Sequence, residues 1–192
     1  MPGTRILTPA GEVAVEALKA GDVVTTAEGE SMPIRWLGRQ TVSRLFADPL
    51  RVLPIRITQG ALGDNMPSRD LLVSPDHALL IDGALIQAGA LVNDTSIVRE
   101  TKVPERFTYY HVELADHSLI LAENTPAETF IDNIDRMAFD NWDEHEALRD
   151  TAEMQLVEMS YPRAKASRQV PRATRDRLAR RAEARNGLSQ VA

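Results

Sequence analysis

Three of the four histidines of this 192-residue chain lie in two short segments rich in apolar and β-branched residues. His77 belongs to the first segment (69–81), and His111 and His117 belong to the second (109–121). A neutral imidazole is the one common side chain whose ordinary pKa, about 6.5, lets it take up or release a proton near neutral pH. These two segments are therefore the first candidates for acid–base chemistry.

Each histidine also has a purely structural interpretation. His77 is flanked by Pro-Asp and Ala-Leu-Leu, so it could cap a strand and satisfy its ring nitrogens on backbone carbonyls. His117 directly follows Asp116, a pair that is also common at solvated turns. His145 lies in an acidic stretch of helical pattern and is predicted to be a surface residue.

A metal site is not predicted, although His77, His111 and His117 with Asp76 and Asp116 are residue types that bind zinc. Zinc sites usually show tight local spacing, such as His-x-x-x-His, which is absent here. Both common phosphate-binding glycine patterns are also absent, which argues against a nucleotide-dependent enzyme. We therefore expect no cofactor, and the Trp36 segment is interpreted as core and turn.

The composition limits the chemistry further. The chain has no Cys, so disulfides, thiolate metal sites and a cysteine nucleophile are excluded from these residues. The first residues lack a signal-peptide pattern, and no apolar run has the roughly 18 residues of a membrane span. We predict no membrane span and a cytoplasmic location by default, or secretion as part of a longer precursor.

Charge is distributed unevenly along the chain. Residues 161–192 hold nine basic and two acidic residues, a net charge of +7, and the other residues carry −13. Clustered arginines can bind nucleic acid phosphates. This tail contains no aromatic residue after Tyr161 and is joined to an acidic body, so we expect it to pack on that body or stay solvated, without specific nucleic acid binding.

Short β-type runs separated by turn residues predict an all-β fold. The predicted strands are Arg5–Thr8, Val13–Val15, Val23–Thr26, Ile34–Gly38, Leu50–Ile57, Asp70–Val73, Ala78–Ile81, Ser96–Glu100, Phe107–Leu114 and Ser118–Ala122.

Helical patterns are confined to the C-terminal part. Residues 140–159 have acids in the first turn and apolar residues at helical spacing, with Asp140 or Asn141 as the expected cap. A second helix is predicted from Pro171 to Arg185, with Gly187 as its stop. We divide the chain into a β module (1–138) and a basic, helical extension (139–192).

The order of several motifs resembles the Hint (hedgehog/intein) family, in particular its bacterial hedgehog-like and intein-like branch. The resemblance covers roughly residues 3–133 and implies a horseshoe of short strands with two similar halves. Its motifs are, in order, residues 3–24, residues 34–39, Ser74–His77 and His111–His117.

This resemblance implies self-processing of a peptide bond. In the family, a first-residue Cys attacks the carbonyl before it, and a Thr-x-x-His motif, matched here by Ser74 and His77, supports departure of the amide nitrogen. His111 and His117 match the second motif and would assist proton transfer. Residues 126–130 contain no His-Asn pair, so splicing at a C-terminal bond is not expected. The substrate would be the protein's own upstream segment.

The chain departs from the family at its start. Members typically read Cys-Phe-x-x-Gly-Thr, and counting back from Gly3 places the Cys just before Met1. A truncated start, a processed form and an inactive relic each explain this. The competing functions are a non-catalytic Hint scaffold and a β-domain adaptor that binds partners through the basic tail. The sequence makes no prediction about the oligomeric state or the acyl acceptor.

Overall fold

The computed structural model describes residues 1–131, 138–149 and 158–189. The strands are β1 (Arg5–Thr8), β2 (Gly11–Ala14), β3 (Val23–Thr25), β4 (Ser31–Pro33), β5 (Trp36–Ser43), β6 (Ile55–Ile57), β7 (Leu71–Val73), β8 (Ala78–Ile81), β9 (Ala84–Gln87), β10 (Ile97–Arg99), β11 (Arg106–Glu113), β12 (Leu119–Ala122), β13 (Thr125–Glu128) and β14 (Arg163–Ala164). The α-helices are α1 (Pro49–Val52), α2 (Trp142–Arg149) and α3 (Arg172–Ser189), and the 3₁₀ turns are η1 (Val15–Ala17), η2 (Ala88–Leu91) and η4 (Ser167–Gln169). The mainly β fold with a C-terminal helix confirms the predicted fold class.

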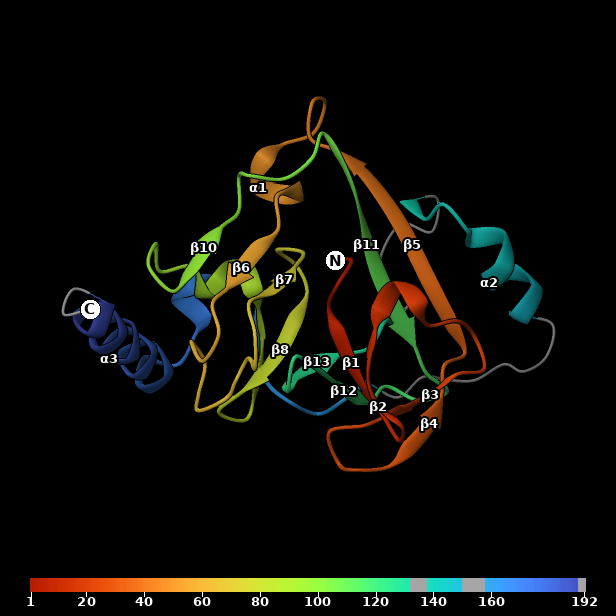
Figure 1. Cartoon of the computed structure of the whole chain (residues 1–192), viewed down its shortest axis with the longest axis horizontal. Helices are drawn as coiled ribbons and strands as arrows, with labels where there is room; N and C mark the ends of the chain where they lie inside the picture. The colour runs from red at the N-terminus through yellow and green to blue at the C-terminus, as the bar shows by residue number, and fades with distance from the viewer. Residues whose placement is uncertain (132–137, 150–157, 190–192) are drawn as a thin grey trace.

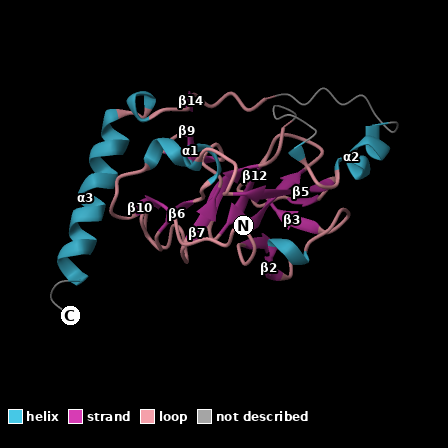
Figure 2. Cartoon of the chain, turned by 90° about the horizontal axis from the view of Figure 1, so that it is seen from above, coloured by secondary structure: helices cyan, strands magenta, loops and turns pink. Residues whose placement is uncertain are grey.

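The largest sheet has seven strands in the order β14-β9-β8-β13-β12-β1-β2. Smaller sheets are formed by β10-β6-β7, by the long two-stranded arm β11-β5 and by β3-β4. Figure 1 shows the N-terminus at the centre of this framework, whereas α2 and α3 lie at opposite ends of the molecule, as Figure 2 shows from above. The topology thus places Met1, which is partly buried, near the centre of the framework, while Pro2 and Gly3 are exposed.

Strand β1 is held between β12 and the edge strand β2 with the help of a buried carboxylate. Glu123 is 2% exposed and lies in the turn between β12 and β13. Its Oε1 accepts hydrogen bonds from the Arg5 backbone N–H and from Arg69 Nη2, both at 2.7 Å. The Glu123 N–H in turn donates to the Arg5 carbonyl at 2.9 Å. One side chain therefore fixes β1, the segment before β7 and the β12–β13 turn.

The sequence patterns miss two strands, β9 and β13, each of which directly follows a tight turn. Asp82 and Gly83, between β8 and β9, have φ of 49° and 77°, and Glu123 and Asn124, between β12 and β13, have 47° and 58°. Two consecutive positive φ values suit the twist of a β-hairpin. The second turn contains no glycine, and β13 includes Pro126, so its sequence does not have a strand's usual appearance.

The predicted strand Leu50–Ile57 is wrong in its first half. Asp48 accepts a hydrogen bond from the Leu50 N–H at 2.9 Å, and Pro49 occupies the start of the short helix α1. Both features favour a helical turn. Pro54 then separates this turn from β6, whose two isoleucines are fully buried.

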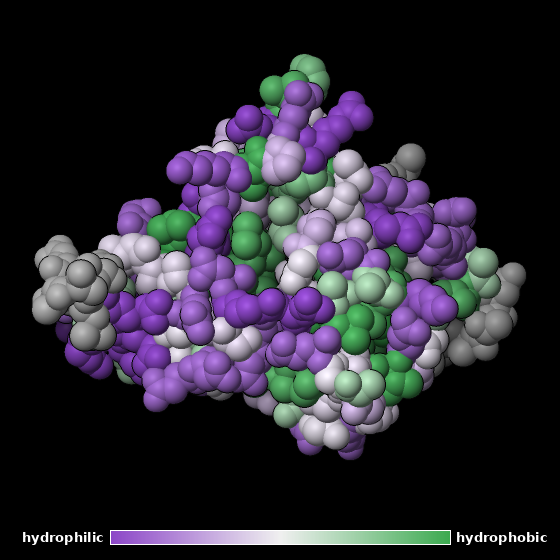
Figure 3. Space-filling model, viewed as in Figure 1, coloured by the Kyte–Doolittle hydropathy of each residue, from purple (hydrophilic) through white to green (hydrophobic). Residues whose placement is uncertain are grey.

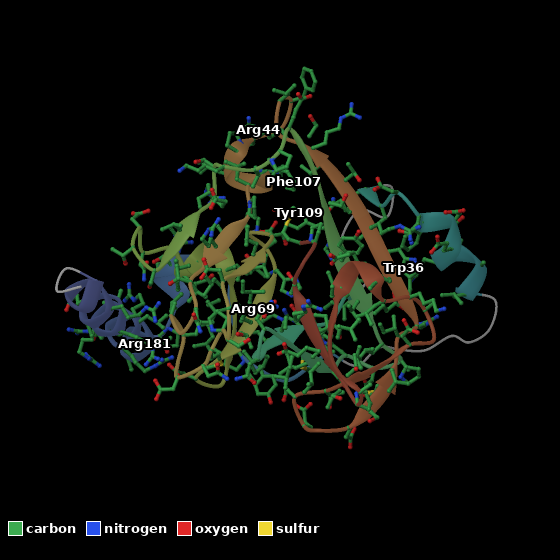
Figure 4. All side chains as sticks on the ribbon, in the orientation of Figure 1. Trp36, Arg44, Arg69, Phe107, Tyr109 and Arg181 are labelled. Carbon is green, nitrogen blue, oxygen red and sulfur yellow. The ribbon has the colours of Figure 1, made fainter. Side chains whose placement is uncertain are left out.

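The largest exposed apolar side chain, Phe46, is 92% exposed, and Leu45 and Leu50 are exposed in the same loop after β5. Figure 3 shows this apolar tip at the top of the molecule. Below it, Phe107 and Tyr109 extend from β11 (Figure 4), and the Tyr109 hydroxyl donates to the Val52 carbonyl at 2.7 Å.

No helix in the described ranges has both the length and the apolar character that crossing a bilayer requires.

The helix predicted for residues 140–159 is described only in part. Helix α2 begins at Trp142, residues 150–157 lie outside the described residues, and Met159 is not helical. Asp140 accepts hydrogen bonds from the Thr41 N–H and hydroxyl, and Asn141 accepts one from the Arg39 N–H. These side chains join α2 to β5, and the proposed domain boundary at residue 138 stays a prediction.

Helix α3 confirms the second predicted helix, but it continues past Gly187 to Ser189. Thr174, Leu178 and Ala182, spaced by four residues, form its buried face. Arg177 binds Asp82 through both guanidinium Nη2 and Nε and donates to the Leu62 carbonyl at 2.6 Å. The basic helix therefore packs on the acidic body through an apolar face flanked by specific ionic contacts.

We expect Arg177→Ala to lower the free energy of unfolding by about 1–2 kcal/mol, measured by urea denaturation. Its hydrogen bond to the Leu62 carbonyl is charge-assisted, a class that contributes roughly 1.5–3 kcal/mol, whereas its partly exposed pair with Asp82 contributes less and is screened by salt. The exposed Arg180→Ala is the matched control and should leave stability unchanged. Equal stabilities of Arg177→Ala and wild type would contradict this docking.

Candidate functional site

The turn Ser74–His77 joins β7 to β8 and is fixed by backbone contacts. The His77 N–H donates to the Ser74 carbonyl, and the His77 carbonyl accepts from the Ala88 N–H at 2.9 Å. Gly89 donates to the Pro75 carbonyl at 2.8 Å, and a Cβ at this glycine would lie 3.2 Å from the same oxygen. Backbone hydrogen bonds from the 3₁₀ turn η2 thus hold the backbone of His77 and Pro75 in place.

The structure brings His77, Ser74 and His111 together, as the motifs predict. His111 lies on β11 opposite Gly38 of β5. It lines the same hollow as Ser74 and His77, which we call the N-terminal hollow because Met1 and Thr4 form another part of its wall. The first residue of the chain is therefore adjacent to both candidate histidines.

A second hollow shares part of its wall with the N-terminal hollow. It is lined by Asp76, Thr129 and Phe130. The residues that line both hollows are Ser74, His77, His111, Val112 and Glu128. A group placed in either hollow would thus meet the same imidazoles.

Burial keeps both imidazoles neutral near pH 7. Desolvation lowers the pKa of His77 to about 4, with the Glu128 carboxylate partly opposing it and the Met1 amino group adding to it. Desolvation lowers the pKa of His111 to about 3, and His77 and the Met1 amino group lower it further. Burial also lowers the pKa of the Met1 amino group to about 6. A neutral imidazole can accept a proton, which is the role of a base.

His111 has an unsatisfied ring nitrogen. Its side chain is 8% exposed and packs edge-on against Phe130 and Phe139, with centroid distances of 5.9 and 5.0 Å. Its Nε2 is buried and has no hydrogen-bond partner within the described part of the chain. Such buried polar atoms are rare in folded proteins. This nitrogen is therefore available to a group that enters the hollow.

His117 does not reach either hollow, unlike the other two motif histidines. Its side chain is fully buried, and its Nε2 lies 2.8 Å from Glu128 Oε1. The Met159 N–H donates to its Nδ1 at 3.1 Å. Both ring nitrogens are thus occupied, so any effect on the hollow passes through Glu128.

Sequence reasoning missed Glu128 and Arg163. Glu128 ends β13 and lines both hollows, and Arg163 Nη2 donates to its Oε1 at 2.6 Å. Alternation along β13, where Thr125 and Ala127 are buried, separates Glu128 from the core face. No local pattern predicts the contact with Arg163, which lies 35 residues later.

The prediction that His145 lies on the surface is wrong. His145 is 6% exposed, and its Nε2 lies 2.8 Å from Glu113 Oε2, while Arg35 binds the other oxygen of Glu113. Its ring stacks on Trp142 at 4.2 Å and meets Trp36 edge-on. Trp142 and His145 are three residues apart, so they share the face of α2 that packs on β5.

Among the described residues, no three His, Cys, Asp or Glu side chains converge in a way that could hold a metal ion. The site has no charged cluster other than Glu128 with Arg163. What the arrangement offers chemically is two neutral bases, one carboxylate and a hydroxyl around the first residue of the chain.

Comparisons with known proteins agree with the motif order. A family model described as Hint domain matches residues 1–133. The chain is similar to the solved structure of a bacterial intein-like domain from Clostridium thermocellum, at 18% identity and a TM-score of 0.45, over 67% of this chain and 96% of that one. It is also similar to the MchDnaB-1 intein, at 13% identity and a TM-score of 0.44, over 66% and 96% of the two chains. No curated protein matched significantly.

We expect His111 to make the protein less stable in acid. The folded protein protonates His111 only near its lowered pKa of about 3, whereas the unfolded chain does so near about 6.5. The unfolded state therefore binds more protons between these values, and the free energy of unfolding falls as the pH is lowered through this range.

Urea denaturation of His111→Gln should then show a smaller loss of stability between about pH 7 and about pH 5, by roughly 1–2 kcal/mol. Lys102→Gln, an exposed substitution, is the control and should keep the wild-type slope. An unchanged slope in His111→Gln would show that the imidazole is not held neutral by burial.

Proposed function

Because the chain belongs to the Hint domain family, we propose that its histidine site carries out self-processing of the peptide bond ahead of a Cys placed two residues before Met1. The substrate is the protein's own upstream segment. The chain itself has no Cys, so the proposed reaction requires a Cys-Phe segment ahead of Met1.

One observation carries the proposal: Met1 and Thr4 line the same hollow as Ser74, His77 and His111. Residues that precede Met1 would therefore be joined to the chain in this hollow, next to both imidazoles. Strand β1 cannot easily move away because it is paired on both edges, with β2 and β12. The sheet thus holds the start of the chain in one place, which supports the proposal because orientation favours catalysis.

In the proposed acyl shift, the Cys sulfur attacks the carbonyl carbon before it. The S–C bond forms, the C–N bond breaks, and the proton lost by the thiol is gained by the departing amide nitrogen. His77, neutral near pH 7, takes this proton and passes it on. Ser74 lines the same wall, and the free Nε2 of His111 is the donor or acceptor available to the reacting amide.

The second candidate function is a non-catalytic Hint scaffold that docks a partner. The 192 residues contain no Cys, and the histidine pair alone supplies no nucleophile, so these residues by themselves would form such a scaffold. The two candidates predict different outcomes when a Cys is provided. A catalytic site should then cleave the peptide bond, and a non-catalytic scaffold should not.

The test is a fusion in which a reporter protein is followed by Cys-Phe directly before Met1, restoring the order Cys-Phe-x-x-Gly-Thr. Dithiothreitol should cleave the thioester and release the reporter, and this release is measured over time by mass spectrometry. General acid–base assistance contributes about 10²- to 10⁴-fold, so His77→Ala should slow the release by about that factor.

Two controls make the result specific. Replacement of the added Cys by Ala should abolish release, and Glu12→Ala, which changes an exposed residue of β2, should not alter the rate. His145→Ala is unsuitable as an inert control because His145 is buried against Trp36. A folded fusion that releases no reporter would support the scaffold, and equal rates for wild type and His77→Ala would remove His77 from the reaction.

A further inference from the structure

Glu128 is the one carboxylate shared by the walls of both hollows in the described structure. Its side chain is only 12% exposed, so water screens its charge weakly. The two protein contacts that hold it, from His117 and Arg163, both fall on Oε1. The carboxylate is thus held through one oxygen by two residues that line neither hollow.

The first contact is a directional hydrogen bond. The Met159 N–H donates to His117 Nδ1, so that nitrogen carries a lone pair and the ring proton is on Nε2. His117 Nε2–H therefore donates to Glu128. Because the imidazole is fully buried, this bond orients the carboxylate.

The second contact comes from beyond the region matched by the family model. Arg163 belongs to β14, which pairs in parallel with β9, in register with Leu85. Its Nη2 donates to Glu128 Oε1 at 2.6 Å, whereas its contact with the exposed Glu158 is longer, at 3.4 Å. The C-terminal extension therefore supplies the guanidinium that forms an ion pair with the ionised Glu128 carboxylate.

These contacts decide the charge of Glu128. Burial alone would raise the pKa of its carboxyl, but the hydrogen bonds from His117 and Arg163 outweigh burial and lower it. Among the described residues, the charged or titratable groups around Glu128 and the two hollows are His77, His111, His117, Asp76, Tyr109, Tyr110, Arg163, Glu158 and the Met1 amino group. Two imidazoles share both hollows with Glu128. The Glu128 charge raises the pKa of His77 against desolvation, whereas desolvation, His77 and the Met1 amino group lower the pKa of His111. His77 is therefore the imidazole that gains from this anion when it takes up a proton.

We propose that Glu128 is a positioning residue for His77: its carboxylate, kept ionised by Arg163 and His117, stabilises the imidazolium that His77 becomes while it carries the thiol proton to the amide nitrogen. This inference rests on the proposed function. Glu128 itself gains and loses no proton in the step, much as the carboxylate of a Ser-His-Asp triad does. The extension then completes the site, and Arg163 acts on the reaction through Glu128.

The first test needs no cleavage. The titration of His77 is followed by NMR of its ring protons in the chain of 192 residues, for wild type, Glu128→Gln and the exposed control Glu28→Gln. Loss of a nearby anion should lower the midpoint of His77 by about one unit, a tenfold lower proton affinity. Glu28→Gln should leave it unchanged. An identical midpoint in wild type and Glu128→Gln overturns the inference.

The second test uses the reporter fusion and its pH–rate profile. Glu128→Gln should slow release about tenfold at neutral pH. Arg163→Ala should move the acid limb of the profile to higher pH, because Glu128 then protonates more readily, and Arg163→Lys should largely restore it. The exposed Arg168→Ala is the matched control in the same extension and should keep the wild-type profile.

The two substitutions are then combined. If Arg163 acts through Glu128, Arg163→Ala should have no further effect on the rate in the Glu128→Gln background. An equal loss in both backgrounds would show that Arg163 only supports the fold, which overturns its assigned role. A fusion that releases no reporter contradicts the proposed function, while the NMR titration still decides whether Glu128 acts on His77.

Discussion

The buried carboxylate of Glu123 is the contact on which the arrangement of the site depends. Its oxygens accept hydrogen bonds from the Arg5 backbone N–H of β1 and from the Arg69 guanidinium, and the backbone N–H of Glu123 donates to the Arg5 carbonyl. Figure 4 shows Arg69 in the central part of the molecule, close to these strands. Arg69 is itself partly exposed, but its removal would be costly because the buried Glu123 carboxylate would lose its charge compensation. The chain start is therefore fixed beside the histidines by a contact outside the hollow.

Around this anchor, apolar packing determines how the imidazoles behave. His111 is enclosed by Phe130 and Phe139, which also pack against Trp36. Gly38, opposite His111, allows this packing, since a Cβ there would collide with the Trp36 ring. A charged imidazole is disfavoured in such surroundings. The same packing therefore stabilises the fold and keeps His111 neutral.

The acidic body and the basic extension meet through a few defined contacts. Arg163 binds Glu128 at the hollows, whereas Arg177 binds Asp82 and Arg181 binds Asp64 at the far end, where Figure 4 shows Arg181 on α3. The two groups of contacts differ in burial. The α3 pairs are partly exposed and serve docking, while Glu128 is shielded enough for its charge to act on a neighbour.

Local sequence alone determined the elements whose residues alternate or recur with a clear period. Strands β1 and β8 lie where the patterns predict them, α3 begins one residue after Pro171, and the motif order identified the family. The meeting of Ser74, His77 and His111 also follows from those motifs. The tertiary structure alone decided the burial of His145 against Glu113 and the contact of Glu128 with Arg163. These contacts join residues more than 30 positions apart, and a histidine in a polar helix or a glutamate at a strand end carries no local signal of its partner, because burial depends on which element packs over it.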